Sequence, residues 1–335
     1  MKKKIYIAYT GGTIGMKASE NGYVPANGHL TESILAMPDF HRQEMPDFTI
    51  NEYQPLIDSS NMTPKDWQRI ADDIFKHYDQ YDGFVVLHGT DTMAYTSSAL
   101  SFMFENLSKP VIVTGSQIPF SQLRSDGQVN LLNSLYVAAN YPINEVGLFF
   151  NNKLFRGNRA IKAIADGFNA FNSPNLPPLL EAGINIKLHE GELAMTSPNK
   201  VWLNFITPQP IGVVYLYPGI SSLLLENIIK QPVKALILKS YGVGNAPQDN
   251  ALLACLTKAN QQGIIIVNCS QCIQGTVNME GYATGTSLSK CGVISGKDMT
   301  LEACLTKLHF LLSQNFSNTE IKQLISENLR GELTV

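Results

Sequence analysis

The segment IYIAYTGGTIGMK, residues 5–17, runs from an apolar stretch into two glycines that are flanked by threonines. A continuous apolar run of this length is typical of a strand buried on both faces, as in a parallel sheet. The glycines predict a tight turn at its end, but a turn needs neither Thr10 nor Thr13. The segment is therefore either a plain connection or a loop that presents a hydroxyl group for chemistry.

The same pattern, an apolar run that ends in small polar residues and precedes a helical period, recurs along most of the chain. Further strands are predicted at residues 84–92, 111–117, 146–152, 212–219, 235–245 and 264–271. Helices are predicted at residues 63–78, 93–106, 130–140, 223–230, 250–261, 301–314 and 320–330. The first of them begins at Thr63, with Pro64 at the first helical position and Asp66 three residues on. One face of this helix is apolar and includes Phe75, so that face is expected to be buried. Alternating strands and helices predict an α/β protein with parallel sheets, in which ligands bind beyond the carboxyl ends of the strands.

The length of 335 residues favours two domains over a single hydrophobic core. Polar residues interrupt the alternation of strands and helices at residues 191–210, which we predict to be a linker. We expect a larger N-terminal catalytic α/β domain at residues 1–190, with a parallel sheet of the flavodoxin or Rossmann type. A smaller C-terminal α/β domain is expected at residues 211–335.

Composition and charge limit the partners of this chain. Hydrophobic residues make up 44% and charged residues 16%, as expected of a globular protein. The net charge of −3 gives no positive field for nucleic acid, and no apolar window is long enough to span a membrane. The apolar run after Lys2–Lys4 is too short for a secretory signal, and five cysteines form an odd set. We therefore expect a cytoplasmic protein with a small-molecule substrate.

Two predicted strand ends concentrate reactive groups: TGGT at residues 10–13 and HGTDT at residues 88–92. Because the carboxyl ends of parallel strands meet at one edge of a sheet, both loops should open on the same side. A hydroxyl group is a weak nucleophile that needs a nearby base, which a third group orients. Asp91 and a lysine could serve, and amides in a glycine-rich turn can hold an oxyanion.

Each loop also has a purely structural explanation. TGGT lacks the P-loop and dinucleotide-binding patterns, so alone it indicates only a strand-to-helix turn. In HGTDT, Asp91 or Thr90 would cap the helix that begins near Met93, and His88 is interpreted as a structural hydrogen-bonding residue. Capping accounts for only one of the polar residues in this motif, so the pair of motifs favours a functional interpretation.

Residues 15–30 form a further feature beside TGGT. They contain three glycines and a proline with few apolar anchors. This composition is typical of a mobile lid over a site.

The segments IAYTGGTIG (7–15) and GFVVLHGTDTM (83–93) resemble the two signature segments of the bacterial-type L-asparaginases. The likeness extends over the whole chain, and because no secretory signal is predicted, the chain resembles the cytoplasmic type I branch. It includes DSSNMTPKDW (58–67), GSQIP (115–119), RSDGQVNLLNSL (124–135) and KSYGVGNAP (239–247). The resemblance implies an amidohydrolase that converts L-asparagine into L-aspartate and ammonia through an acyl-enzyme, with no metal or organic cofactor.

The resemblance also implies roles for individual residues. Thr13 would be the nucleophile that attacks the side-chain amide of the substrate. Tyr23, in the lid, would help to take the proton of that nucleophile. Thr90, Asp91 and Lys162 would form a second set centred on a hydroxyl group.

The substrate pocket is implied in the same way. Asp58, Ser59 and Ser60 would hold the α-carboxylate and α-amino groups, and Asp91 would contribute at the amino end. A zwitterionic amino acid needs both a carboxylate for its ammonium group and donors for its carboxylate, which this set supplies.

Two further features come from the resemblance. The backbone amides of Gly12 and Thr90 would hold the oxyanion. Asn245, in YGVGN, is a candidate because the family often completes its site with the C-terminal domain of a neighbouring subunit. A homodimer or homotetramer is therefore expected.

Three alternatives remain open. A mixed glutaminase-asparaginase would share the fold, because one methylene is discriminated by only about 1 to 3 kcal/mol. The amidase subunit of a tRNA-dependent amidotransferase would need a basic surface for RNA. A non-catalytic amino-acid-binding α/β protein would bind a ligand tightly without releasing ammonia.

Overall fold

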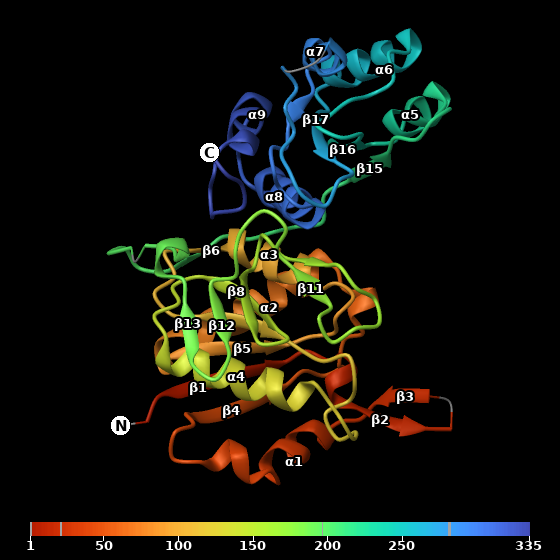
Figure 1. Cartoon of the computed structure of the whole chain (residues 1–335). Helices are drawn as coiled ribbons and strands as arrows, with labels where there is room; N and C mark the ends of the chain where they lie inside the picture. Colours follow the sequence, from red (N-terminus) through yellow and green to blue (C-terminus); the bar gives the residue numbers. More distant parts are fainter. Residues whose placement is uncertain (1, 21, 196, 281–282) are drawn as a thin grey trace. The chain divides into compact units, whose positions relative to one another are not determined.

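The computed structural model describes residues 2–20, 22–195, 197–280 and 283–335. The chain forms two compact units, Met1–Asn204 and Phe205–Val335, whose elements are labelled in Figure 1. This division falls within residues 191–210, and the linker expected there stays a prediction. Across these described ranges, no helix combines the length and the apolar character that crossing a membrane requires.

The first unit is built on an eight-stranded sheet with the order β13-β12-β9-β8-β7-β5-β1-β4. The adjacent strands β4, β1, β5, β7 and β8 run parallel to one another. The pairs β8–β9, β9–β12 and β12–β13 are antiparallel. The strands are β1 (Lys4–Tyr9), β4 (Asp47–Glu52), β5 (Gly83–Leu87), β7 (Val111–Thr114), β8 (Val146–Phe150), β9 (Lys153–Arg156), β12 (Leu180–Ala182) and β13 (Ile186–Leu188). Numbered in chain order, the parallel strands follow 2-1-3-4-5, the flavodoxin-like order. The predicted fold class is confirmed.

Helices cover both faces of this sheet. α2 begins as predicted, with a capping box between Thr63 and Asp66 and with Pro64 at the first helical position. Its residue Phe75, which the sequence places on the buried face, is instead 39% exposed, because the buried stripe is narrower than the apolar pattern. The helices of this unit are α1 (His29–Leu35), α2 (Pro64–His77), α3 (Met93–Met103) and α4 (Gly127–Asn140).

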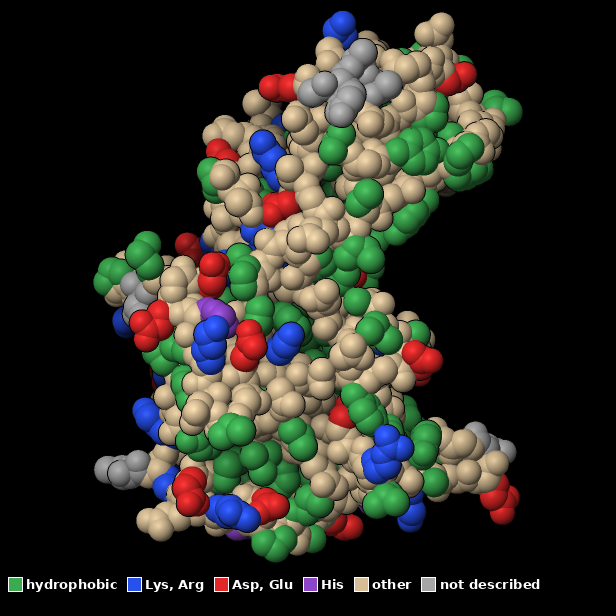
Figure 2. Space-filling view, viewed as in Figure 1, with side chains coloured by type: hydrophobic (Ala, Val, Ile, Leu, Met, Phe, Trp, Pro, Cys, Tyr) green, Lys and Arg blue, Asp and Glu red, His purple; other side chains and the backbone are tan. Residues whose placement is uncertain are grey.

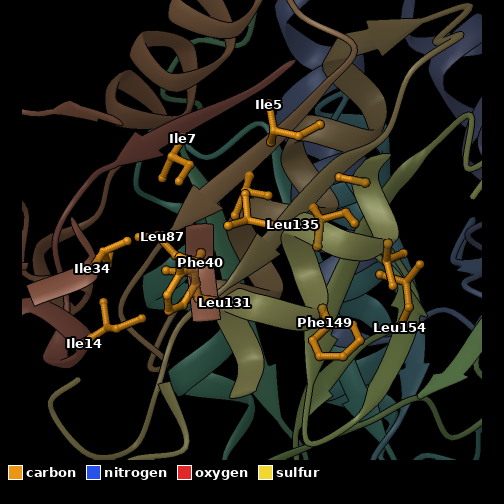
Figure 3. Close-up of a cluster of buried hydrophobic side chains, with 14 of the residues drawn as sticks. Ile5, Ile7, Ile14, Ile34, Phe40, Leu87, Leu131, Leu135, Phe149 and Leu154 are labelled. Carbon is orange, nitrogen blue, oxygen red and sulfur yellow. The ribbon is translucent and has the colours of Figure 1, made fainter. Parts of the chain in front are cut away.

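Alternate residues of β1 face opposite sides of the sheet. Ile5, Ile7 and Tyr9 belong to the core cluster that includes Leu131 and Leu135 of α4, and Figure 3 shows the aliphatic members of this cluster facing one another. Tyr6 faces α2 instead, where its hydroxyl donates to the Asp73 carboxylate at 2.9 Å. A strand buried on both faces produces the continuous apolar run in the sequence.

The second unit has its own four-stranded parallel sheet, in the order β15-β16-β17-β18. Its strands are β15 (Ile211–Tyr215), β16 (Ala235–Ser240), β17 (Ile265–Ser270) and β18 (Ile294–Ser295). Its helices are α5 (Ser222–Ile229), α6 (Asn250–Gln261), α7 (Ala283–Lys290), α8 (Leu301–Ser313) and α9 (Asn318–Ser326). The smaller C-terminal α/β part of the predicted fold is thus present.

Some elements differ from the sequence predictions. α3 ends at Met103 and not at residue 106, and the last helix covers Asn318–Ser326 and not residues 320–330. β4 was not predicted, because DFTINE alternates polar and apolar residues at the sheet edge. Short pairings were also missed, since main-chain bonds and not side-chain patterns define them: β6 (Phe104–Glu105) with β14 (Trp202–Leu203), and β10 (Ile161–Lys162) with β11 (Phe171–Asn172).

The segment interpreted as a lid contains an antiparallel hairpin of β2 (Met16–Ser19) and β3 (Gly22–Pro25). In Figure 1 this hairpin extends outward from the eight-stranded sheet of its unit. Every described residue of β3 is exposed. The hairpin therefore keeps its shape through its own main-chain pairing.

Charged side chains are mixed over the face that Figure 2 shows. Basic and acidic groups alternate there, and neither sign covers a continuous area. This mixed surface agrees with the net charge of −3 and differs from the basic stripe of a nucleic-acid-binding protein.

Thr10 joins the ends of β1 and β5. Its backbone N–H and its hydroxyl both donate to the carbonyl of Leu87, at 3.0 and 2.8 Å. Its own carbonyl accepts the N–H of Ile57 at 2.7 Å. Thr10, to which the sequence assigns no role, fixes the start of the TGGT loop against two neighbouring segments.

We expect Thr10→Val to lower the free energy of unfolding by about 1 kcal/mol, the net value of one hydrogen bond. Valine keeps the shape of the buried side chain but removes the hydroxyl that donates to Leu87. Urea denaturation measures the change. A valine variant as stable as the wild type would show that this hydroxyl does not hold the two strand ends together.

Candidate active site

The two signature loops leave the sheet side by side. β1 and β5 are adjacent and parallel, and Tyr9 pairs with Leu87 at their carboxyl ends. TGGT follows the first strand and HGTDT follows the second, so both open on the same edge, as the sequence predicts. In the 2-1-3-4-5 order this position is the switch point, where open α/β sheets bind their ligands.

Glycines allow the backbones of three loops to touch at this edge. A Cβ atom added to Gly12 would lie 2.4 Å from the Cα atom of Gly89, and one added to Gly89 would lie 2.4 Å from Ser59 Oγ. Gly12 also has a φ of 91°, which disfavours any residue with a side chain. The loops after β1, β4 and β5 therefore form one compact surface.

In the sequence, Thr13 precedes Gly15 and Tyr23 follows it. Thr13 is half-buried and begins the short helical turn η1 (Thr13–Gly15). Tyr23 belongs to β3, pairs with Ala18 of β2 and is 50% exposed. The structure thus presents Tyr23 at the surface of the hairpin, and the joint action predicted for these two residues stays a prediction.

Lys162 reaches two of the polar residues of the HGTDT loop. Its ammonium group donates to Thr90 Oγ1 at 2.9 Å and to Asp91 Oδ1 at 2.7 Å. Thr90 is buried, the Asp91 side chain is 62% exposed and the Lys162 side chain is 21% exposed. The structure therefore brings together the three residues that the sequence connects only through resemblance.

Gln117 is a further member of this cluster that sequence reasoning missed. Its Nε2 donates to the carbonyls of Ala165 and Gly167 at 3.0 and 3.1 Å, which fixes the orientation of the amide. Its Oε1 must then face Thr90, whose hydroxyl donates to it at 3.1 Å. Because this bond uses the hydroxyl hydrogen, the Thr90 oxygen accepts from Lys162. The signal in the sequence was a polar residue three positions after the strand VIVT, at the edge of the sheet where the two signature loops open.

Asp126 holds Gln117 in turn. Its carboxylate accepts the backbone N–H of Gln117 at 2.9 and 3.1 Å and that of Ile118 at 3.1 Å. Burial raises the pKa of Asp126, and these hydrogen bonds oppose the shift. Gln117 and Asp126 lie in GSQIP and RSDGQVN, segments that carry the resemblance but had no individual assignment.

The loop after β4 carries the predicted pocket residues. Asp58 caps the short turn η3 (Ser59–Asn61) by accepting the N–H of Ser60 at 3.0 Å. Ser59 is buried, and Ser60 is exposed. Ser59 lies beside Gly89, and the contact of these three residues with a substrate stays a prediction.

The capping explanation of HGTDT is wrong. The N-cap position of α3 is Thr92, and its side chain makes no capping hydrogen bond. Its hydroxyl instead donates to the carbonyl of Ser59 at 2.7 Å, because that loop lies closer than the helix amides. Asp91 and Thr90 are therefore available to Lys162.

Asn245 belongs to the second unit. Its backbone exchanges two hydrogen bonds with Tyr241, at 2.8 and 2.9 Å, which close a tight turn after β16. Its contribution to a site stays a prediction.

His88 has the structural role that the sequence favours. Its Nδ1 lies 2.7 Å from the carbonyl of Gly89, which can only accept, so Nδ1 carries the hydrogen. Its Nε2 then accepts from the Thr96 hydroxyl at 2.8 Å. Burial lowers the pKa of His88 to about 4, so the ring is neutral beside the reactive loop.

Comparisons with known proteins agree with this layout. The family model "Asparaginase, N-terminal" matches residues 4–193, and "Glutaminase/Asparaginase C-terminal domain" matches residues 210–325. The chain therefore belongs to the asparaginase family, and the resemblance seen in the signature segments is confirmed.

Individual relatives match over nearly their whole length. L-asparaginase 1 of Escherichia coli (strain K12) is 66% identical over 333 residues, which cover 99% of this chain and 98% of that protein. The crystal structure of L-asparaginase I from Vibrio cholerae has a TM-score of 0.94 and 62% identity, with 100% of both chains covered. The L-asparaginase of Thermococcus kodakarensis has a TM-score of 0.90 at 29% identity, with 99% of both chains covered.

We expect the buried His88 to make the protein less stable in weak acid. The unfolded chain binds a proton near pH 6.5, whereas the folded protein binds it only near pH 4. The free energy of unfolding should therefore fall as the pH falls between these values, by up to about 3 kcal/mol. Urea titrations of the wild type and of His88→Gln test this contribution. Equal pH slopes in the two proteins would contradict it.

Proposed function

We propose that this chain hydrolyses L-asparagine to L-aspartate and ammonia, with Thr13 as the nucleophile. The observation that carries the proposal is the cluster of Thr90, Asp91 and Lys162 beside the TGGT loop, at the switch point of an asparaginase-family sheet. Such a site needs no metal or organic cofactor, because hydroxyl, carboxylate and ammonium groups supply the nucleophile, the anchor and the proton carrier.

Substrate binding follows from the charges at the sheet edge. The exposed carboxylate of Asp91 can hold the α-ammonium group of asparagine, which is a charge-assisted hydrogen bond. Ser59 and Ser60, with the loop that Asp58 caps, can donate to the α-carboxylate. With both ends of the amino acid held, the side-chain amide can lie within about 3 to 3.5 Å of Thr13, a distance suited to attack.

The reaction then proceeds in two steps, which are the formation and the hydrolysis of an ester on Thr13. The Thr13 oxygen bonds to the amide carbon while its proton passes toward Tyr23, and the backbone amides of Gly12 and Thr90 hold the oxyanion. Tyr23 passes that proton on to the amide nitrogen, the C–N bond breaks, and ammonia leaves an aspartyl ester on Thr13. Water attacks that ester, its proton passes through the Thr90 hydroxyl to the departing Thr13 oxygen, the bond between the acyl carbon and that oxygen breaks, and L-aspartate is released. Tyr23 takes part once the hairpin covers the site.

Gln117 supports this chemistry through Thr90. Its amide is fixed by the carbonyls of Ala165 and Gly167, so it holds the Thr90 hydroxyl in one orientation. The Thr90 oxygen then stays within reach of Lys162, through which protons can enter and leave. We therefore count Gln117 as a positioning residue and not as one that touches the substrate.

The cellular location and the oligomeric state complete the proposal. We propose a cytoplasmic homodimer or homotetramer, in which Asn245 of a neighbouring subunit approaches the site. The support is the likeness over almost the full chain to L-asparaginase 1 of E. coli. A mixed glutaminase-asparaginase is the second candidate, because the family model of residues 210–325 covers both activities in its description.

Replacing Thr13 by alanine should lower ammonia release from asparagine by about a thousandfold or more, the loss expected when a nucleophile is removed. Thr13→Ser is the matched control, since it keeps a hydroxyl and should keep measurable turnover. Coupled detection of ammonia measures both. If Thr13→Ala kept near-normal turnover, Thr13 would not be the nucleophile.

Steady-state kinetics with asparagine and glutamine distinguish the remaining candidates. We expect kcat/KM for asparagine to exceed that for glutamine by about 10- to 200-fold, the range expected for one methylene. Equal values would identify a mixed enzyme. Tight binding of asparagine without ammonia release would instead identify a non-catalytic binding protein.

A further inference from the structure

The two ends of the hairpin β2–β3 meet on one pair of neighbouring side chains. Tyr9 is the last residue of β1 and Glu52 is the last residue of β4, and the two pair in register. Tyr9 contacts the segment where the chain enters the hairpin, and Glu52 holds the segment where the chain leaves it. This Tyr9–Glu52 pair thus lies beneath both stems of the proposed lid.

The entry stem rests on the Tyr9 ring. Gly15 ends η1, and the next residue, Met16, begins β2. A Cβ atom added to Gly15 would lie 1.7 Å from the Tyr9 hydroxyl oxygen, so the backbone there is in direct contact with the ring. Any movement of the hairpin about this stem therefore changes the surroundings of the Tyr9 hydroxyl.

The exit stem is held by Glu52. Its carboxylate accepts the backbone N–H of Gly28 at 2.9 Å and the hydroxyl of Thr31 at 3.3 Å. Gly28 is the N-cap of α1 and has a φ of 75°, which marks the point where the chain turns from the hairpin into the helix. Glu52 therefore fixes the end of the hairpin segment.

The Tyr9 hydroxyl is a buried donor without an acceptor. The side chain is 0% exposed, and none of the described residues pairs with its hydroxyl. Burial and the charge of Glu52 both raise the pKa of Tyr9, so the group stays protonated. An unpaired buried hydroxyl costs free energy, and an arrangement of the stem that offers it an acceptor is favoured to that extent.

We propose that Tyr9 and Glu52 are positioning residues for the hairpin and, through it, for Tyr23. Glu52 anchors the exit stem, while the Tyr9 hydroxyl donates to a main-chain carbonyl of the entry stem when the hairpin covers the site. The hydrogen bond that the Tyr9 hydroxyl lacks among the described residues then favours the arrangement in which the hairpin covers the site. This inference rests on the proposed function, since it concerns the lid of that same site.

Tyr6 provides a matched control within the same strand. It faces the opposite side of the sheet, and its hydroxyl already donates to both oxygens of Asp73, at 2.9 and 3.0 Å. Tyr6→Phe therefore removes a satisfied hydrogen bond far from the hairpin stems, whereas Tyr9→Phe removes an unsatisfied hydroxyl beneath one of them. The two variants make the same chemical change with opposite expected effects.

Tyr9→Phe should lower kcat/KM for asparagine by about two- to tenfold, the effect of one ordinary hydrogen bond, while the melting temperature stays equal or rises. Tyr6→Phe should lower the melting temperature and leave kcat/KM unchanged. In a Tyr23→Phe background, Tyr9→Phe should have no further effect, because it acts through Tyr23. The proposal would be overturned if Tyr9→Phe left kcat/KM unchanged or lowered the melting temperature. Additive effects on kcat/KM in the double variant would also overturn it.

Trypsin cleavage after the exposed Lys17 of β2 provides a readout that does not need catalysis. Glu52→Gln should accelerate this cleavage in the ligand-free protein, because its exit stem is held less firmly. L-aspartate should protect the wild type more strongly than either Tyr9→Phe or Glu52→Gln. Identical cleavage in all three proteins would overturn the proposal.

The two experiments separate this inference from the proposed function. A wild type that releases no ammonia from asparagine contradicts the proposed function. If the wild type is active, and if Tyr9→Phe and Glu52→Gln match it in kinetics and in cleavage, only the positioning role is contradicted. Faster cleavage of ligand-free Glu52→Gln supports that role whatever the activity of the wild type.

Discussion

The close contact of three backbone loops at the switch point of the sheet is the constraint on which the site depends. Neither Gly12 nor Gly89 has room for a Cβ atom, so the loops after β1, β4 and β5 behave as one surface. Thr10 and Thr92 fasten this surface with buried or half-buried hydroxyls that donate to neighbouring carbonyls. This main-chain packing sets the geometry of the reactive groups, because the movement of any one loop breaks its contacts with the other loops.

Buried polar groups complete the support. His88 is neutral and satisfied at both ring nitrogens, while Asp126 and Gln117 form a chain of hydrogen bonds that ends at Thr90. Each member of such a network must be paired, because an unpaired buried polar group is costly. The same reasoning makes the unpaired Tyr9 hydroxyl notable, as it lies where the hairpin begins and not within the rigid part of the site.

Sequence reasoning was most successful where one residue type has one physical purpose. Continuous apolar runs identified the buried parallel strands, and Thr63, Pro64 and Asp66 identified the start of α2. β4 was missed because an edge strand needs fewer apolar residues, and Phe75 was misplaced because an apolar pattern does not show how wide the covered stripe is. Family resemblance supplied Lys162, since its contact with Thr90 joins segments that only the tertiary fold brings together. Gln117 could not be assigned, because its role depends on the carbonyls of Ala165 and Gly167.

The position of Lys162 has a consequence for how the enzyme loses its activity on heating. Within the part of the chain that the structure describes, its strand β10 pairs with β11 alone, in a two-stranded ribbon outside the eight-stranded sheet. Two-stranded ribbons are marginal by themselves, and proteins open locally at such elements before they unfold as a whole. Separation of this ribbon removes the lysine from Thr90 and Asp91 while the sheet remains folded. Thermal inactivation can therefore begin as a local and reversible event, at temperatures below the melting of the first unit.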